Sequence, residues 1–187
     1  MSVLEEKSYQ VTVEEFYQMY ESGMFAEDDR VELIEGEIIH MTPIGSWHSA
    51  VVDRLNELFV ERFSAYAIVR IQGAVLLSRK SEPLPDVVVM KRKEDFYASG
   101  HPQPEDMFLI VEVSDTTIRY DRSIKVPLYA RSGISEVWIV NLQEDWIEAY
   151  RKPLFSDYQE KIVYRRGQRI APEFYADAVF LVDDILG

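Results

Sequence analysis

The chain has 187 residues, and its hydrophobic content of 47% suits one globular domain spanning residues 1–187. Cysteine is absent, which excludes disulfides and thiolate zinc sites. The 20 Lys and Arg against 33 Asp and Glu give a net charge of −13, which argues against a general nucleic-acid binder that works by neutralising phosphates.

Residues 1–7, at the start of the chain, lack the basic region and the apolar core of a signal peptide. No apolar run in the sequence approaches the ~18 residues of a membrane-spanning helix. We therefore expect a soluble, cytoplasmic protein with no membrane partner.

Residues 12–63 are predicted to form two helices separated by a hairpin. Thr12 and Glu15 have the spacing of a capping box, which predicts a helix over residues 12–21. Residues 31–41 alternate around Glu35-Gly36, which predicts a hairpin whose turn uses the positive φ of glycine. Apolar side chains recur at helical spacing over residues 49–63, which predicts an amphipathic helix.

The rest of the chain is predicted to supply mainly strands. Strands are expected over residues 67–78, 86–90, 108–114, 136–142, 146–151 and 158–165, and the apolar tail 180–186 is expected to pack on their sheet. One helix is predicted over residues 119–131, kinked at Pro127 and closed by Gly133. This order predicts an α/β or α+β fold with a mixed central sheet flanked by helices.

Lys91-Arg92-Lys93 opens a long loop over residues 91–104. A basic triplet is most often a solvated surface, yet in so acidic a chain it is also a candidate phosphate contact. The length of the loop suggests a mobile flap over the functional site.

Two carboxylates are embedded in apolar strands. Asp86 precedes Val87-Val88-Val89-Met90, and Glu112 lies within Phe108-Leu109-Ile110-Val111-Glu112-Val113. Burying a carboxylate is unfavourable by several kcal/mol unless a cation or hydrogen bonds compensate. Two carboxylates with a backbone carbonyl and waters make an ordinary Mg²⁺ site, so we expect Asp86 and Glu112 to share a divalent metal.

Lys125 follows Asp121 by four residues in the predicted helix 119–131, so both side chains lie on one helical face. A surface ion pair worth only ~0.3 to 0.5 kcal/mol is one interpretation of that spacing. The other is functional: a lysine beside a metal site can position the attacking water and offset charge growing on a phosphate.

An ordered set of motifs resembles the Uma-two family of putative restriction endonucleases within the PD-(D/E)XK nuclease superfamily. The matching pieces run from about residue 31 to 142 and comprise Val31-Glu32-Leu33-Ile34-Glu35-Gly36-Glu37, His48, Ser81-Glu82-Pro83-Leu84-Pro85-Asp86, Val111-Glu112-Val113-Ser114, Asp121, Lys125, Pro127-Leu128-Tyr129-Ala130 and residues 133–140.

The resemblance implies a restriction-endonuclease-like fold and a metal-dependent endonuclease, with DNA as the expected substrate. By this resemblance Asp86 and Glu112 bind Mg²⁺ or Mn²⁺ with the carbonyl of Val113, Lys125 positions water, and Glu32 is an accessory acid. Cleavage of two strands makes a homodimer plausible. The catalytic set is therefore Asp86, Glu112, Lys125 and Glu32.

One departure from the superfamily pattern concerns Ser114, which stands where the usual lysine would follow Glu112. Lys125 on the next helix is expected to take over that role. The alternative is a catalytically inactive module that keeps the nuclease fold, which the −13 charge and Ser114 both favour. A glycosidase using Asp86 and Glu112 would leave Lys125 without a role. His48 resembles a family position near the active site, although a lone histidine at a helix start is more often a capping or packing residue. Gln72 is expected to point into the same cleft, and the roles of His48, Gln72 and Asp121 stay open.

Overall fold

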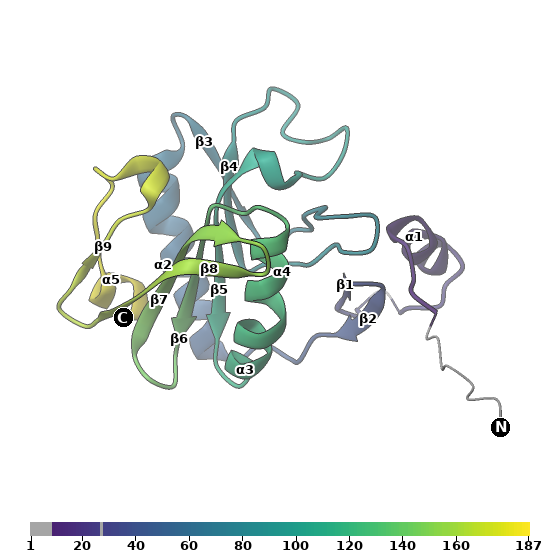
Figure 1. Cartoon of the computed structure of the whole chain (residues 1–187), viewed down its shortest axis with the longest axis horizontal. Helices are drawn as coiled ribbons and strands as arrows, with labels where there is room; N and C mark the ends of the chain where they lie inside the picture. Colours follow the sequence, from purple (N-terminus) through teal and green to yellow (C-terminus); the bar gives the residue numbers. More distant parts are fainter. Residues whose placement is uncertain (1–8, 27) are drawn as a thin grey trace.

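The structure is a computed structural model that describes residues 9–26 and 28–187; the expectation about residues 1–7 lies outside this part. A six-stranded sheet forms its centre, in the order β3-β4-β5-β6-β7-β8, and helices cover both faces (Figure 1). The predicted fold class, a mixed central sheet flanked by helices, is confirmed. No helix in the described ranges is long and apolar enough to span a membrane.

The central strands are β3 (Ala67–Ile71), β4 (Val87–Lys91), β5 (Met107–Ser114), β6 (Glu136–Asn141), β7 (Trp146–Leu154) and β8 (Asp157–Arg165). Two small sheets pair β1 (Val31–Ile34) with β2 (Glu37–His40), and β9 (Arg169–Ile170) with β10 (Phe180–Leu181). The helices are α1 (Val13–Glu21), α2 (Ser46–Phe63), α3 (Ile118–Tyr120), η2 (Asp121–Lys125), α4 (Val126–Arg131) and α5 (Val182–Leu186), with single 3₁₀ turns η1 (Pro104–Asp106) and η3 (Glu173–Tyr175).

The topology of the sheet decides where the two strand carboxylates meet. β5 and β6 are parallel, joined by the helical run α3, η2 and α4, whereas β4 is antiparallel to β5. Val87 is the register partner of Val111, so Asp86, one residue before β4, comes beside Glu112. Residues directly opposite each other on paired strands point to the same face. The carboxyl end of β5 is therefore the place where the acids gather.

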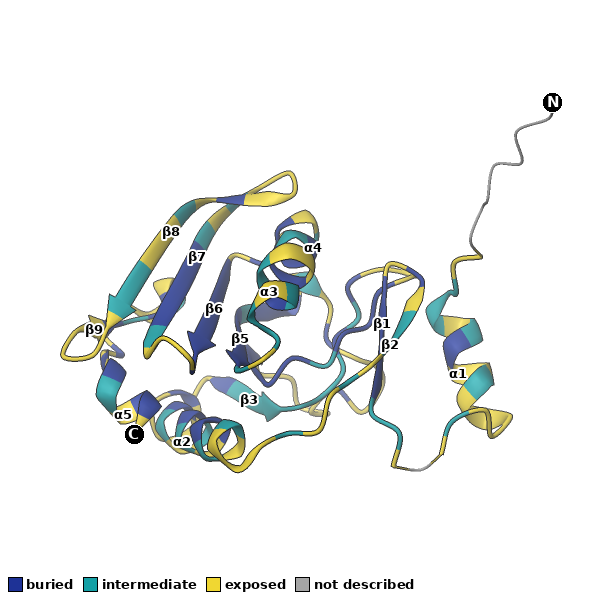
Figure 2. Cartoon of the chain, turned by 90° about the horizontal axis from the view of Figure 1, so that it is seen from below, coloured by how far each residue is buried: buried dark blue, intermediate teal, exposed yellow. Residues whose placement is uncertain are grey.

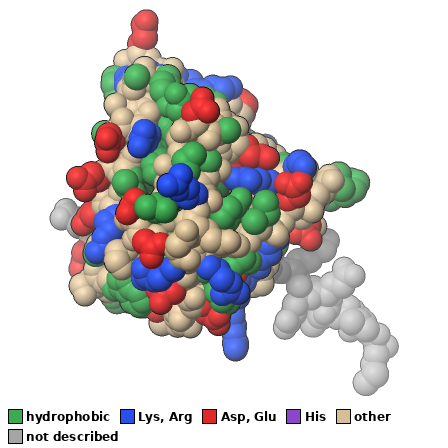
Figure 3. All heavy atoms as spheres, turned by 90° about the vertical axis from the view of Figure 1, so that its left-hand side faces the viewer, with side chains coloured by type: hydrophobic (Ala, Val, Ile, Leu, Met, Phe, Trp, Pro, Cys, Tyr) green, Lys and Arg blue, Asp and Glu red, His purple; other side chains and the backbone are tan. Residues whose placement is uncertain are grey.

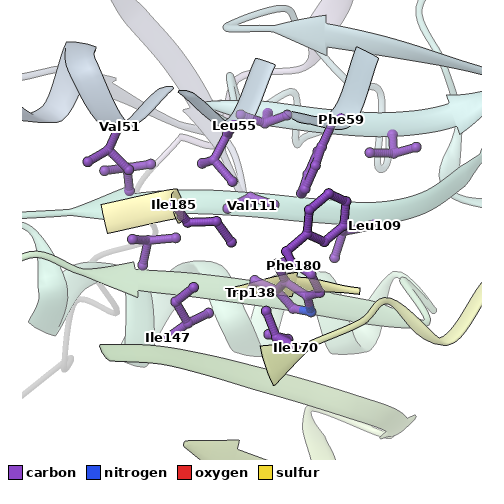
Figure 4. Packing of buried hydrophobic residues seen from close by; sticks show 14 of the residues in the cluster. Val51, Leu55, Phe59, Leu109, Val111, Trp138, Ile147, Ile170, Phe180 and Ile185 are labelled. Atoms are coloured by element: carbon purple, nitrogen blue, oxygen red, sulfur yellow. The ribbon is translucent and has the colours of Figure 1, made fainter. Parts of the chain in front are cut away.

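Both faces of the sheet are buried, which explains why the strands read as continuous apolar runs. Leu55 and Phe59 of α2 pack on one face against Trp138, together with Phe180 from the C-terminal segment (Figure 4). On the other face, the run ending in α4 brings Tyr129 against the alternate residues of β5 and β6. Figure 2 shows α2 and α4 on opposite sides of the sheet. The tail predicted to pack on the sheet does so through β10 and α5.

The N-terminal segments form a small unit of their own beside the sheet (Figure 2). The capping box is confirmed, because Thr12 Oγ1 accepts from the amide of Glu15 and the Glu15 carboxylate accepts from the amide of Thr12. The hairpin is confirmed as well, with Gly36 at φ +85° in its turn. Phe16 of α1 packs with Val31 and Leu33 of β1 in a separate cluster.

Two sequence-based predictions are wrong in detail. The strand expected over residues 67–78 ends at Ile71, because Gln72 adopts a φ of +48° and leaves the sheet. The loop after β4 does not cover the carboxylates. β4 runs antiparallel to β5, so the loop after Lys91 starts beside Met107, at the end of β5 opposite to Glu112. Lys93 pairs there with Asp106, at 3.0 Å.

Candidate active site

A cavity of about 380 Å³ lies at the carboxyl end of β5. The sheet supplies its floor, α2 and the α3–η2 run supply two walls, and the β1–β2 hairpin with the segment after it supplies a third. All four residues of the predicted catalytic set contribute to its lining. The lining comprises Glu32, Ile39, His40, Met41, Thr42, Pro43, Ile44, Gly45, His48, Asp86, Glu112, Val113, Asp115, Thr116, Thr117, Tyr120, Asp121 and Lys125.

Asp86 is held by three donors that fix its carboxylate at the cavity. Its Oδ2 accepts from the amide of Val113 at 2.9 Å and lies 3.1 Å from Nε2 of His48. Its Oδ1 accepts from Nε2 of Gln72 at 3.3 Å. The amide of Gln72 also donates to the carbonyl of Asp86, at 3.0 Å. Gln72 therefore binds Asp86 through both its side chain and its backbone amide, and it does so with a left-handed backbone conformation.

Val113 presents its polar backbone to the side of the sheet where Asp86 lies. The carbonyl of Ser114 accepts from the amide of Leu142, on the β6 side. Successive strand residues direct their N–H and C=O groups to alternate sides, so those of Val113 face the β4 side. The 2.9 Å bond from its amide to Asp86 agrees with this direction.

Lys125 is buried in the cavity and contacts two buried acids, Glu32 and Glu112. Nζ of Lys125 lies 3.2 Å from Oε1 of Glu112 and 3.2 Å from Oε2 of Glu32, and the hydroxyl of Tyr129 also donates to Glu112. Burial raises the pKa of Glu112 to about 8, against the opposing attraction of Lys125. Burial alone would lower the pKa of Lys125, but the attraction of Glu112 and Glu32 outweighs it and raises that pKa. Lys125 is therefore held as an ammonium ion.

The helix that carries Lys125 is not the continuous α-helix predicted over residues 119–131. Asp121–Lys125 forms a π-helical turn between α3 and α4, with the amide of Val126 donating to the carbonyl of Asp121. The π-turn precedes Pro127, which sits in the first turn of α4, where a missing N–H is tolerated. The change of helix type thus lies directly before the proline, and such π-turns are frequent at functional sites.

Asp121 does not act as the ion-pair partner that its spacing from Lys125 suggests. Its Oδ2 accepts from Ser114 Oγ at 2.6 Å and from Thr117 Oγ1 at 2.7 Å, while the ammonium of Lys125 contacts Glu32 and Glu112. Ser114, which replaces the expected lysine, thus holds Asp121. Burial raises the pKa of Asp121.

A second ion-paired cluster fixes the π-turn to the sheet. The guanidinium of Arg122 binds the Glu148 carboxylate through Nε and Nη2, and Glu148 also accepts from Tyr150 and pairs with Lys161 at 3.0 Å. Glu148 is 1% exposed on β7. Sequence reasoning missed this cluster, although an acid between Ile147 and Ala149 in an alternating strand was a signal for it.

The cavity gathers more acidic side chains than basic ones. Glu32, Asp86, Glu112 and Asp121 are all buried and face one ammonium, that of Lys125. Carboxylates in such excess fit a hard divalent cation, which prefers oxygen ligands. Within residues 9–26 and 28–187, however, no three His, Asp or Glu side chains converge closely enough to make a complete cage. A cation here would need backbone or water oxygens as well, as Mg²⁺ sites usually have.

One family model and two solved structures resemble this chain. A family model described as "Uma2: Putative restriction endonuclease" matches residues 13–180. A solved structure of a putative nuclease belonging to DUF820, from Anabaena variabilis ATCC 29413, has a TM-score of 0.72 at 16% identity, covering 94% of this chain and 97% of that chain. The type IIG restriction endonuclease BpuSI gives a TM-score of 0.36 at 16% identity over 59% of this chain and 13% of that chain. No curated protein matches the chain.

Proposed function

The chain belongs to the Uma2 family of putative restriction endonucleases, and we propose that it is a metal-dependent endonuclease that hydrolyses phosphodiester bonds in DNA. The observation that carries this proposal is the meeting of Asp86, Glu112 and Lys125 in one cavity. Two acids and a protonated lysine are the groups that metal-assisted phosphodiester hydrolysis requires.

In this proposal Asp86, Glu112 and the carbonyl of Val113 would hold Mg²⁺ or Mn²⁺. The metal, when bound, supplies Lewis-acid activation of the water and of the phosphate. Gln72, His48 and the Val113 amide orient Asp86 for this role, through the bonds of 3.3, 3.1 and 2.9 Å.

Lys125 acts as a fixed positive charge in the proposed reaction. Because its pKa is raised, it keeps its protons and orients water or a phosphate oxygen by donating hydrogen bonds. Oε2 of Glu32 contacts the ammonium, and the same oxygen accepts from the amide of Leu84 at 3.2 Å. Glu32 is therefore an accessory acid that positions Lys125.

The electrostatics of the chain make substrate binding depend on the metal. Its net charge is −13, and on the face shown in Figure 3 acidic and basic side chains are interspersed without a broad basic area. A phosphodiester approaching the buried carboxylates would be repelled. We infer that DNA binds weakly without a divalent cation. Cleavage of both strands in one binding event would use two copies of the cavity, one on each strand, so we include a homodimer in the proposal.

Thermal unfolding with and without metal tests the metal site. Millimolar Mg²⁺ or Mn²⁺ should raise the unfolding midpoint of the wild type, because a ligand that binds only the native state stabilises it. Asp86→Asn, which keeps the shape of the side chain, should lose most of this rise. Plasmid nicking in Mn²⁺ at low salt tests the activity. A wild type that neither responds to metal nor nicks any DNA would favour a nuclease-fold binding module instead.

A further inference from the structure

Two buried side-chain atoms in residues 9–26 and 28–187 lack a hydrogen-bond partner: Nδ1 of His48 and the hydroxyl of Tyr120. Both side chains line the same cavity. Native proteins satisfy nearly all buried polar groups, so such exceptions call for an explanation. Two exceptions in one cavity indicate that it is shaped for a polar ligand.

Tyr120, which is half-buried, differs in this respect from three buried tyrosines of the chain. The hydroxyl of Tyr129 donates to Glu112, that of Tyr150 to Glu148, and that of Tyr158 to the carbonyl of Ile134, at 2.7 Å. Each of these hydroxyls is bound to the protein. That of Tyr120 is not, although it comes from the same helical run as Lys125.

The position of Tyr120 connects its hydroxyl with the proposed reaction. Tyr120 ends α3, directly before the π-turn that carries Lys125. Burial and the nearby charge of Glu32 raise the pKa of Tyr120, so its hydroxyl keeps its proton and remains a donor. A donor of this kind suits an anionic oxygen, which the surrounding carboxylates would otherwise repel.

We propose that the Tyr120 hydroxyl is a substrate-binding group that donates a hydrogen bond to a non-bridging oxygen of the phosphodiester held beside Lys125. This inference rests on the proposed function and adds a residue to it. The hydroxyl is buried without a partner, so turning the side chain to present it to the substrate breaks no hydrogen bond within the protein.

Tyr120→Phe tests the proposal with Tyr158→Phe as the matched control. Each variant removes one buried hydroxyl and keeps the ring. Tyr158→Phe breaks an existing bond to the backbone, so its unfolding midpoint should fall while nicking per folded molecule stays unchanged. Tyr120→Phe removes a hydroxyl without a partner, so its midpoint should equal or exceed that of the wild type. Its kcat/KM for plasmid nicking in Mn²⁺ should fall about 10- to 100-fold.

A second measurement separates this inference from the proposed function. The midpoint rise caused by thymidine 5′-phosphate in Mg²⁺ should be smaller for Tyr120→Phe than for the wild type. If the wild type nicks and Tyr120→Phe nicks equally, this inference alone is overturned. A midpoint that falls as in Tyr158→Phe would show a protein partner for the hydroxyl and overturn it too. If the wild type neither nicks nor responds to thymidine 5′-phosphate, the proposed function fails and this inference with it.

Discussion

Replacing Lys125 by Met removes the ammonium that lies 3.2 Å from both Glu32 and Glu112 while retaining most of the apolar stem. Removing one partner of a buried ion pair typically costs about 3–5 kcal/mol, because a charge is left uncompensated. Without the attraction of Lys125 the pKa of Glu112 would rise further, so in the variant Glu112 takes up a proton and loses its charge. We therefore expect a loss at the lower end, about 3 kcal/mol of unfolding free energy.

A double-mutant cycle isolates the ion pair from other effects of the substitution. Glu112→Gln combined with Lys125→Met removes both charges, so the double variant should recover about 1–3 kcal/mol relative to the sum of the single variants. Urea unfolding without metal measures all four proteins, with equal m values as the check that the unfolding transition itself is unchanged.

The same variants separate stability from chemistry. Mg²⁺ should raise the midpoint of Lys125→Met at least as much as that of the wild type, because the carboxylates keep their affinity for a cation. Nicking should fall about 10²- to 10³-fold, as for other electrostatic groups of this kind. A stability loss below ~1 kcal/mol together with an additive cycle would refute the buried triad of Glu32, Lys125 and Glu112.

Two further predictions concern the scaffold. Burial would raise the pKa of Glu148, but hydrogen bonds from Arg122, Tyr150 and Lys161 outweigh it and lower the pKa from 4.5 to about 2. The ionised Glu148 therefore contributes its full stabilisation to the folded protein above pH 4.5, and this contribution is lost as the pH falls toward 2. Glu148→Gln should lower the unfolding free energy at pH 7, measured in urea, by about 3 kcal/mol. The variant should also lose less unfolding free energy than the wild type between pH 4.5 and pH 2, and an equal loss in both proteins would contradict this. Phe59→Ala should cost about 3–5 kcal/mol, since Phe59 is fully buried against Trp138 and Phe180, and a loss below ~1.5 kcal/mol would contradict that packing.

The sequence allowed the fold class and the neighbourhood of Asp86 and Glu112 to be predicted, because both depend on local patterns. Apolar runs identify strands buried on two faces, and the acids interrupt those runs near their ends. The capping box at Thr12 and the turn at Gly36 were predictable for the same reason, since each needs only a few adjacent residues.

Contacts between distant segments could not be predicted in this way. The meeting of Glu32 and Lys125 depends on where the β1–β2 hairpin docks, which no periodicity in the sequence encodes. The π-turn has a longer hydrogen-bonded ring than the α-helix that the 3.6-residue pattern predicts, and it lies directly before the helix whose first turn contains Pro127. That the Tyr120 hydroxyl has no hydrogen-bond partner depends on how the surrounding side chains pack, so no local sequence pattern predicts it.

The separate cluster of Phe16, Val31 and Leu33 gives the N-terminal unit its own local stability. Its backbone is tied to the rest by bonds such as that from the amide of Glu82 to the carbonyl of Leu33, at 2.7 Å. Small units of this kind open by sub-global fluctuations at a lower free energy than global unfolding. Such an opening withdraws Glu32 from the ammonium while the central sheet stays folded. Amide hydrogen exchange in β1 and β2 should therefore be faster than in β5, and its rate reports how often Lys125 is released from Glu32.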